Sequence, residues 1–241
     1  MNIFVTGVSS GLGNELTREL LSEGHNVWGV SRKNSDSPAL SSLQINKNFI
    51  YSKCDISNID EVSAIIDQLI KKDFNVDIVI LNAGVMSNDI QNYRFNNNKF
   101  KDVFNINLYG TVNIIDKVLP LFQQKRQGIF IGISSFSAYN GIVKDKVAYP
   151  ASKAALNMVF TAFRFQFGTS KIRFVTINIG SISEKKSILR MSSSYNQVAQ
   201  KIISTFSKKK NIYHYPYIYS LLIRVLKCLP NSFISRYIIK R

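Results

Sequence analysis

The chain has 241 residues, a hydrophobic fraction of 45% and a formal net charge of +16 at pH 7. Its length and hydrophobic fraction suit one globular domain with a sizeable core. Two cysteines are too few for a disulfide framework, which favours a reducing, cytoplasmic location. The first residues lack the basic and apolar regions of a signal peptide, and there is no run of about 18 apolar residues, so we expect neither secretion nor a membrane-spanning helix.

Short apolar strands alternate with amphipathic helices along the chain. The first strand is predicted at Ile3–Val5, and the segment 11–24 that follows carries leucines at helical spacing. Further strands are predicted at 27–30, 49–54, 76–81, 128–133 and 173–179, and further helices at 62–70, 101–124, 149–167 and 198–206. This repetition predicts an α/β fold with a doubly wound parallel sheet and helices on both faces. We expect a single domain over 1–211 and a separate tail over 212–241.

A glycine-rich turn follows the first strand and precedes the first helix. The turn contains Gly7, Ser9, Ser10, Gly11, Leu12 and Gly13. Glycines let the backbone turn tightly and approach a pyrophosphate, and the helix N-terminus offers free N–H groups to the anion. A glycine-rich turn also has purely structural uses, but its position after the first strand of a doubly wound pattern favours dinucleotide binding.

The end of the second predicted strand indicates which dinucleotide is bound. NAD sites usually place an acidic residue there to bind the ribose 2′-hydroxyl, whereas this chain has Ser31, Arg32 and Lys33. A guanidinium can bind a 2′-phosphate with two hydrogen bonds, and a serine hydroxyl can add another. An exposed arginine at a strand end needs no such role, but we predict NADP(H) in preference to NAD(H).

Tyr149 and Lys153 are four residues apart, so a helix would place them on one face. A nearby ammonium would lower the pKa of the phenol and make the pair a proton donor and acceptor. With 11 tyrosines in the chain, about one such pair is expected by chance, so the spacing alone carries little weight. The surroundings add more, because Ser135 and the turn Asn82–Gly84 end two predicted strands, and Asn107 is a polar residue inside an apolar helix pattern.

Together these residues resemble the short-chain dehydrogenases/reductases over about residues 1–185. The resemblance implies a Rossmann-like sheet of about seven strands and an NADP(H)-dependent oxidoreductase that interconverts a carbonyl and an alcohol. The tetrad that it implies is Asn107, Ser135, Tyr149 and Lys153. Ser135 would polarise the substrate oxygen and Tyr149 would carry the proton. Lys153 would lower the Tyr149 pKa and hold the ribose, and Asn107 would position a water.

The same resemblance implies a set of cofactor contacts. These are Gly7, Ser9, Ser10, Gly11, Leu12, Gly13, Ser31, Arg32, Asp55, Ile56, Asn82, Ala83, Gly84, Tyr149, Lys153 and Ile182. It also implies a substrate loop near 181–197 and a homodimer or homotetramer joined through the helices near 101–124 and 149–167. Phe160, Phe163 and Phe167 fit either that interface or the core. We predict no metal site.

Two positions depart from the family pattern. The chain has Ile179 where the family usually has proline, and Glu184 where it usually has threonine. These changes affect the expected contact to the nicotinamide carboxamide, for which the Ile182 backbone or Ser183 can substitute. They also keep open an alternative function, a catalytically silent NADP(H)-binding regulator or membrane-surface protein.

The C-terminal part of the chain is strongly basic. From Lys185 to Arg241 there are twelve Lys or Arg and no Asp or Glu, so this segment supplies +12 of the net +16. Within 220–229 an apolar stripe has Arg224 and Lys227 beside it, which is typical of a basic amphipathic helix. Such a tail can pack on the domain, pack on a second subunit, or lie on the anionic inner face of a membrane. We predict no nucleic-acid partner, because no binding motif accompanies the charge.

Overall fold

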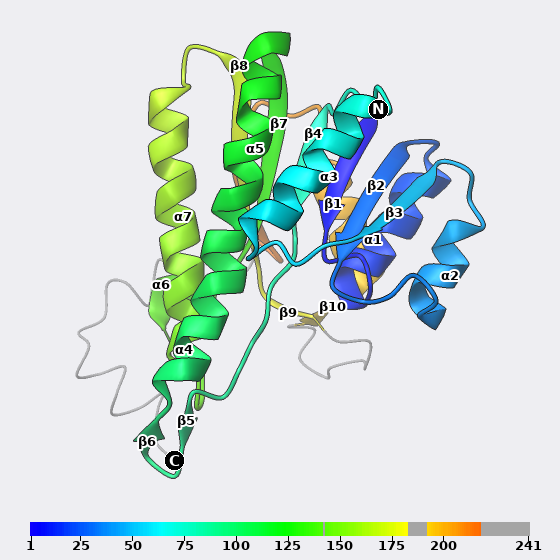
Figure 1. Ribbon diagram of the computed structural model, residues 1–241. Helices are drawn as coiled ribbons and strands as arrows, with labels where there is room; N and C mark the ends of the chain where they lie inside the picture. Colours follow the sequence, from blue (N-terminus) through cyan, green and yellow to red (C-terminus); the bar gives the residue numbers. More distant parts are fainter. Residues whose placement is uncertain (142, 183–191, 218–241) are drawn as a thin grey trace.

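The computed structural model describes residues 1–141, 143–182 and 192–217, and its centre is a seven-stranded sheet (Figure 1). The strands are β1 (Asn2–Thr6), β2 (Asn26–Ser31), β3 (Phe49–Lys53), β4 (Ile78–Leu81), β7 (Gln127–Ser135), β8 (Lys171–Ile179) and β11 (Ile212–Tyr215). Their order is β11-β8-β7-β4-β1-β2-β3, and every neighbouring pair is parallel. The predicted doubly wound parallel sheet is confirmed, and the chain reverses its direction of progress across the sheet between β1 and β4.

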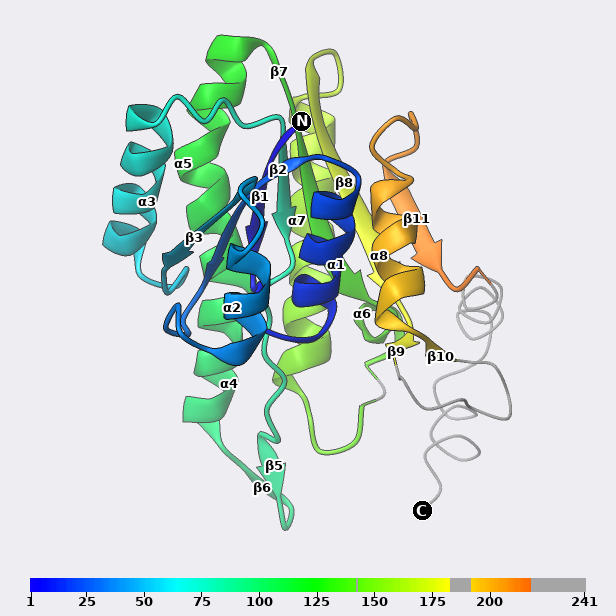
Figure 2. The same ribbon diagram turned by 90° about the vertical axis from the view of Figure 1, so that its right-hand side faces the viewer.

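Helices cover both faces of the sheet, as Figure 2 shows. They are α1 (Gly11–Ser22), α2 (Pro38–Gln44), α3 (Ile59–Lys71), α4 (Asn97–Phe104), α5 (Gly110–Lys125), α6 (Ser137–Asn140), α7 (Ala148–Gln166) and α8 (Tyr195–Ile203). The central strand β1 is buried on both sides, because Ile3 and Val5 pack in the core under α1 and α8 while Phe4 packs in the core under α3, α5 and α7. Strands buried on both faces read as continuous apolar runs, which is why they were predictable.

The predicted helix over 101–124 is one helical rod with an irregular turn inside it. Helix α4 leads into the π-helical turn η1 (Asn105–Tyr109), and α5 follows directly. Asn107 lies in this turn and is fully buried. A π turn inserts one extra residue and re-aims the side chains around it, and such turns are frequent at functional sites.

Helix α8 begins at Tyr195 rather than at the predicted Val198. Ser194 caps it, since its hydroxyl accepts a hydrogen bond from the Gln197 N–H at 3.2 Å and the Gln197 side chain accepts one from the Ser194 N–H at 3.1 Å. This reciprocal capping box satisfies two backbone donors at the helix start. The predicted substrate loop near 181–197 therefore ends at Ser194, and 183–191 lies outside the described residues.

The predicted domain boundary between 211 and 212 is wrong. Strand β11 (Ile212–Tyr215) is the seventh strand of the sheet and pairs with β8 from Thr176 to Ile179. Its Tyr213 is buried against the core under α1 and α8. The domain therefore includes the first residues of the predicted tail, and the predicted amphipathic helix at 220–229 lies outside the described residues.

Several short elements were not predicted. They are α2, α6, the antiparallel pair β5 (Ile90–Gln91) and β6 (Arg94–Phe95), and the parallel pair β9 (Ser181–Ile182) and β10 (Ser192–Ser193). In Figure 1 the β5–β6 hairpin projects below α4, beyond the end of the sheet. Among the described helices none has the length and apolar character needed to cross a bilayer.

Candidate active site

A cavity of about 520 Å³ lies where β1, β2, β3 and β4 end. Predicted cofactor residues that line it are Gly7, Ser9, Ser10, Leu12, Gly13, Ser31, Arg32, Asp55, Ile56, Asn82, Ala83, Gly84 and Ile182. The exception in the glycine-rich turn is Gly11, where an added Cβ would instead lie 3.5 Å from the Tyr195 hydroxyl. Cavities at the carboxyl ends of parallel strands, where the strand order reverses, are the usual ligand sites of such sheets.

The glycine-rich turn is packed too tightly to hold larger residues. A Cβ on Gly13 would lie 2.0 Å from the Gly7 carbonyl oxygen, and Gly7 itself has a φ of 79°. The turn is tied to the end of β4, because the Asn82 side chain donates hydrogen bonds to the Thr6 and Gly7 carbonyl oxygens at 3.1 and 3.3 Å. The Thr6 hydroxyl in turn accepts a hydrogen bond from the Ala83 N–H at 3.0 Å. Asn82 and Ala83 thus shape the turn as well as lining the cavity.

The N-terminus of α1 opens onto this cavity. Its N-cap residue, Ser10, makes no capping side-chain hydrogen bond, so the first N–H groups of the helix lack a side-chain acceptor there. Unpaired N–H groups and the positive end of the helix dipole favour a bound anion. The turn therefore has both the space and the donors for a phosphate group.

Arg32 and Lys33 line the same cavity. Arg32 is exposed, and within the described chain its guanidinium has neither a hydrogen bond nor an ion pair. Asp55 is held in place, since its Oδ1 accepts from the Ser57 hydroxyl at 2.7 Å and from the Ser57 N–H at 3.0 Å. The cavity lining therefore includes both a free cation and a fixed carboxylate.

A second cavity, of about 200 Å³, adjoins the first and shares several lining residues with it, among them Gly84, Val85 and Ile182. Ser135, at the end of β7, lines this second cavity together with Tyr149 and Lys153 from α7. The parallel strands end at one edge of the sheet, which is why residues far apart in the sequence meet here. Three of the four predicted catalytic residues therefore share one cavity.

Lys153 is fully buried beside Tyr149. Its Nζ donates a hydrogen bond to the Ile133 carbonyl oxygen at 2.8 Å and lies 5.9 Å from the centroid of the Tyr149 ring. Burial disfavours the charged ammonium and lowers the Lys153 pKa from 10.5 to about 8. An amine with this pKa can change its protonation state near physiological pH.

Burial also acts on Tyr149, in the opposite direction. It raises the phenol pKa above its usual 10, while a side-chain hydrogen bond with Ser135 acts to lower it. Lys153 is not among the causes of this shift, so the lowering of the Tyr149 pKa by Lys153 stays a prediction. Desolvation dominates, and the Lys153 ammonium is bonded to the Ile133 carbonyl oxygen rather than to the phenol.

Asn107 supports the site from outside both cavities. Its Oδ1 accepts from the Val85 N–H at 2.7 Å, and its Nδ2 donates to the Val85 carbonyl oxygen at 3.0 Å and to the Ser152 hydroxyl at 3.1 Å. A Cβ on Gly84 would lie 3.3 Å from the Asn107 oxygen and 3.4 Å from the Lys153 nitrogen, so these two side chains flank one glycine. The partners of Asn107 are therefore the Val85 backbone, which lines both cavities, and the Ser152 hydroxyl. The role of Asn107 in holding a water stays a prediction.

Asp89 anchors the start of the helix that carries Tyr149 and Lys153. It is completely buried, and its two carboxylate oxygens accept from the Val147 and Ala148 N–H groups at 2.8 and 2.6 Å. A carboxylate at a helix N-terminus satisfies free N–H groups and interacts favourably with the helix dipole. Sequence reasoning missed Asp89 because the residues that it bonds lie 58 and 59 positions away.

Other residues of the larger cavity were also missed. They are Val30, Cys54, Val85, Met86, Ile106 and Tyr195. Most are apolar and carry no chemical signature in the sequence. Tyr195 had a usable signal, since it is an aromatic residue within the predicted substrate loop near 181–197.

The geometry defines a class of protein, a parallel α/β sheet with a dinucleotide-type cavity beside a Ser-Tyr-Lys cluster. Comparison with known families identifies it further, because residues 1–192 match the family model described as short chain dehydrogenase. This match covers most of the chain. The protein therefore belongs to the short-chain dehydrogenase family.

Individual relatives are distant in sequence, and each match covers only part of the relative's length. The chain is 30% identical over 155 residues to an NADPH-dependent pterin aldehyde reductase of Arabidopsis thaliana, covering 64% of each protein. It is 29% identical over 182 residues to a 3-ketodihydrosphingosine reductase of Bacteroides thetaiotaomicron, covering 75% of this chain and 64% of the relative. The chain thus spans less than two thirds of the length of these curated relatives.

Solved structures show the same fold at low sequence identity. A short chain dehydrogenase of Burkholderia cenocepacia, solved in complex with NADP, has a TM-score of 0.81 and 19% identity, covering 97% of this chain and 95% of the other. Serine dehydrogenase of Escherichia coli has a TM-score of 0.77 and 22% identity, covering 89% and 95%. These likenesses confirm the Rossmann-like fold.

Proposed function

We propose that this protein is an NADP(H)-dependent oxidoreductase that interconverts a carbonyl and an alcohol on a small-molecule substrate, with Tyr149 as the acid and base. The observation that carries the proposal is the junction of the two cavities. Gly84, Val85 and Ile182 line both, so a dinucleotide bound along the glycine-rich turn would extend toward Ser135, Tyr149 and Lys153. A hydride-transfer enzyme needs its cofactor and its proton donor to meet in this way.

The residues of the larger cavity fit a phosphorylated dinucleotide. The turn at Gly7 and Gly13 is packed so closely that a Cβ at either position would meet backbone atoms, and the N-terminus of α1 would hold the pyrophosphate. Arg32 would bind the 2′-phosphate that distinguishes NADP(H) from NAD(H), and Asp55 and Ile56 would contact the adenine. A bound nicotinamide would supply or accept the hydride. NADPH in the name of the Arabidopsis relative and NADP in the Burkholderia complex support this choice.

The chain's own residues would handle the proton. Because the Tyr149 pKa is raised, the phenol is protonated at neutral pH and can donate its proton to a carbonyl oxygen as it gains negative charge. Ser135 would hydrogen-bond the same oxygen. Lys153 would hold the ribose and replenish the proton, for which its pKa of about 8 is suited.

The test is a screen of NADPH oxidation against a panel of aldehydes and ketones, followed by the Tyr149→Phe variant on any substrate found. Loss of the general acid should lower turnover by a factor of about 100 to 10,000 while NADPH binding persists. Tyr93→Phe is the matched control, because that phenol is fully exposed on the β5–β6 hairpin. If Tyr149→Phe retains full activity, or the unmodified protein binds NADPH and turns over no carbonyl, a catalytically silent NADP(H)-binding protein becomes the better proposal.

We also propose a homodimer or homotetramer, joined in part through α7. Phe160 is fully buried, and Phe163 and Phe167 pack partly buried on the same core, so these aromatic residues belong to the fold. The exposed large apolar residues of α7 are Met158 and Phe165, which are 69% and 86% exposed. Light scattering of the unmodified protein and of Phe165→Ser tests this, and a monomer in both would contradict it.

Peripheral membrane contact through the basic tail is a separate proposal. It rests on the charge of residues 212–241, of which the structure describes only the strand and the turn that follows it. Flotation with anionic vesicles should recover the full chain and lose a variant shortened after 217. Equal recovery of both proteins would remove the proposal.

A further inference from the structure

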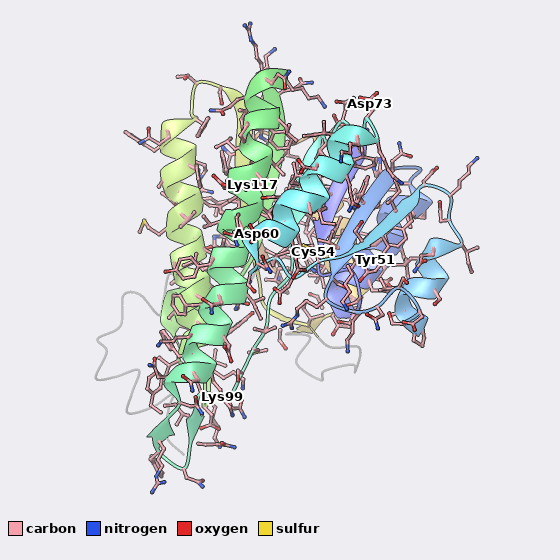
Figure 3. All side chains as sticks on the ribbon, viewed as in Figure 1. Tyr51, Cys54, Asp60, Asp73, Lys99 and Lys117 are labelled. Atoms are coloured by element: carbon pink, nitrogen blue, oxygen red, sulfur yellow. The ribbon has the colours of Figure 1, made fainter. Side chains whose placement is uncertain are left out.

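One tyrosine hydroxyl on the neighbouring strand contacts the loop that carries Arg32 on both sides of that residue. Tyr51 lies on β3, the edge strand beside β2, and is labelled in Figure 3. Its Oη lies 2.9 Å from the Ser31 hydroxyl oxygen, 3.1 Å from the Ser31 carbonyl oxygen and 2.5 Å from the Lys33 carbonyl oxygen. Tyr51 thus contacts the residue before Arg32 and the residue after it.

The donors and acceptors of this cluster can be assigned. A phenol has one proton, and the two carbonyl oxygens can only accept, so the Tyr51 proton is directed at them. The Ser31 hydroxyl must then donate its own proton to the Tyr51 oxygen, and it accepts from the Lys33 N–H at 3.3 Å. Ser31 consequently has no proton left to offer a phosphate.

Arg32 is in a different position. Its side chain lines the larger cavity, is exposed, and has neither an ion pair nor a hydrogen bond within the described part of the chain. Because the backbone on both sides of it is held by Tyr51, the direction in which the guanidinium leaves the loop is restricted. A pre-oriented guanidinium loses less conformational entropy when it binds a phosphate with two hydrogen bonds.

We propose that Tyr51 is a positioning residue for cofactor selectivity, which orients Arg32 toward the 2′-phosphate while Ser31 serves the loop and not the ligand. This rests on the proposed use of NADP(H) and replaces the sequence-based expectation that Ser31 contacts the phosphate. Tyr51 does not itself line the cavity, so it acts through the loop.

The experiment compares dissociation constants for NADPH and NADH across five proteins: the unmodified chain, Tyr51→Phe, Ser31→Ala, Arg32→Ala and the double variant Tyr51→Phe/Arg32→Ala. Tyr51→Phe keeps the ring and removes the hydroxyl. It should weaken the binding of NADPH about 3- to 10-fold while changing the binding of NADH less than about twofold. Ser31→Ala should weaken NADPH less, because the two carbonyl bonds of Tyr51 remain. In the Arg32→Ala background, Tyr51→Phe should have almost no effect on NADPH, since Tyr51 acts through Arg32.

A direct phosphate contact from Ser31 predicts the opposite order, with Ser31→Ala weakening NADPH more than Tyr51→Phe does, and that result would overturn the inference. Equal losses of affinity for NADPH and NADH in Tyr51→Phe would also overturn the inference, because they would show a general loss of structure. Tyr93→Phe is again the control for removing a tyrosine hydroxyl.

The outcome also separates this inference from the proposed function. If the unmodified protein prefers NADPH and Tyr51→Phe leaves the preference unchanged, only the inference about Tyr51 fails. If the unmodified protein binds NADPH no more tightly than NADH, the cofactor preference and the inference about Tyr51 both fail.

Discussion

Arg32 and Lys153 are cations at the two ends of the site, and they differ in nearly every physical respect. Arg32 is exposed at the end of β2 and has no partner within the described chain. Lys153 is fully buried in α7, bonded to a carbonyl oxygen, with a pKa lowered to about 8. An exposed guanidinium keeps its charge at any physiological pH and is screened by salt, whereas a buried ammonium is insensitive to salt and sensitive to pH.

This difference shows how two adjoining cavities can serve two tasks. Recognition of an anionic phosphate requires a permanent charge that water and the ligand can reach. Movement of a proton requires a group whose protonated and neutral forms are close in free energy, which burial of the Lys153 amine provides. The four predictions that follow test this contrast, from the largest expected effect to the smallest.

Lys153→Met should lower turnover by a factor of about 100 or more if Lys153 supports proton transfer. It should also change the pH dependence of stability. Between the folded pKa of about 8 and the unfolded value of 10.5 the unfolded chain binds more protons, so the stability contributed by this residue rises with pH there. The difference in free energy of unfolding between the unmodified protein and the variant should follow this rise, as urea titrations would show. The control is Lys171→Met, an exposed lysine of β8; an identical pH dependence in both variants would contradict the assignment.

Gly13→Ala should destabilise the fold and abolish NADPH binding. The new Cβ would lie 2.0 Å from the Gly7 carbonyl oxygen, so the turn must move, at a cost of about 3 kcal/mol or more. Thermal unfolding and nucleotide titration measure the two effects. Unchanged binding in this variant would show that the glycine-rich turn does not approach the cofactor.

Asp89→Asn should destabilise the protein by about 1 to 3 kcal/mol and reduce turnover. An amide has one accepting oxygen where the carboxylate has two, so the Val147 or Ala148 N–H loses its partner at the start of α7. Urea unfolding gives the stability, and Asp102→Asn on the exposed side of α4 is the matched control. A loss no larger than that of the control would show that this cap is not needed.

Arg32→Ala should weaken the binding of NADPH about tenfold, which corresponds to about 1.4 kcal/mol, and leave the binding of NADH nearly unchanged. Since an exposed ion pair is screened, raising the salt concentration should reduce the NADPH preference of the unmodified protein and barely affect that of the variant. Lys47→Ala removes another exposed positive charge and is the control. A preference that does not depend on salt would point to recognition by groups other than Arg32.

The phosphate end could be predicted from neighbouring residues alone, whereas the catalytic end could not, for a physical reason. The glycine-rich turn and Ser31–Lys33 are local segments, in which the residues that act together are adjacent in the chain. The cavity at the catalytic end combines Gly84, Ser135 and Tyr149, and their order in space depends on which strands are neighbours. Resemblance to a family identified that set in advance. The spacing of Tyr149 and Lys153 alone would not have identified it.

Contacts and burial that arise only in the folded chain explain the errors. Strand β11 was assigned to the tail because its alternating tyrosines are not an apolar run, and it is a strand because β8 offers it an edge. The raised pKa of Tyr149 was missed because burial is a property of the folded chain. Asp89 and Tyr51 were missed because their partners lie on other elements.

By itself the sequence determined the alternation of strands and helices, the position of the phosphate turn and the absence of an acidic residue at the end of β2, since each depends on neighbouring residues and on periodic burial. Only the tertiary structure decided the order of the strands, the burial of Lys153 and the hold of Tyr51 on the loop of Arg32. These depend on contacts between segments whose separation in the chain says nothing of their distance in the fold.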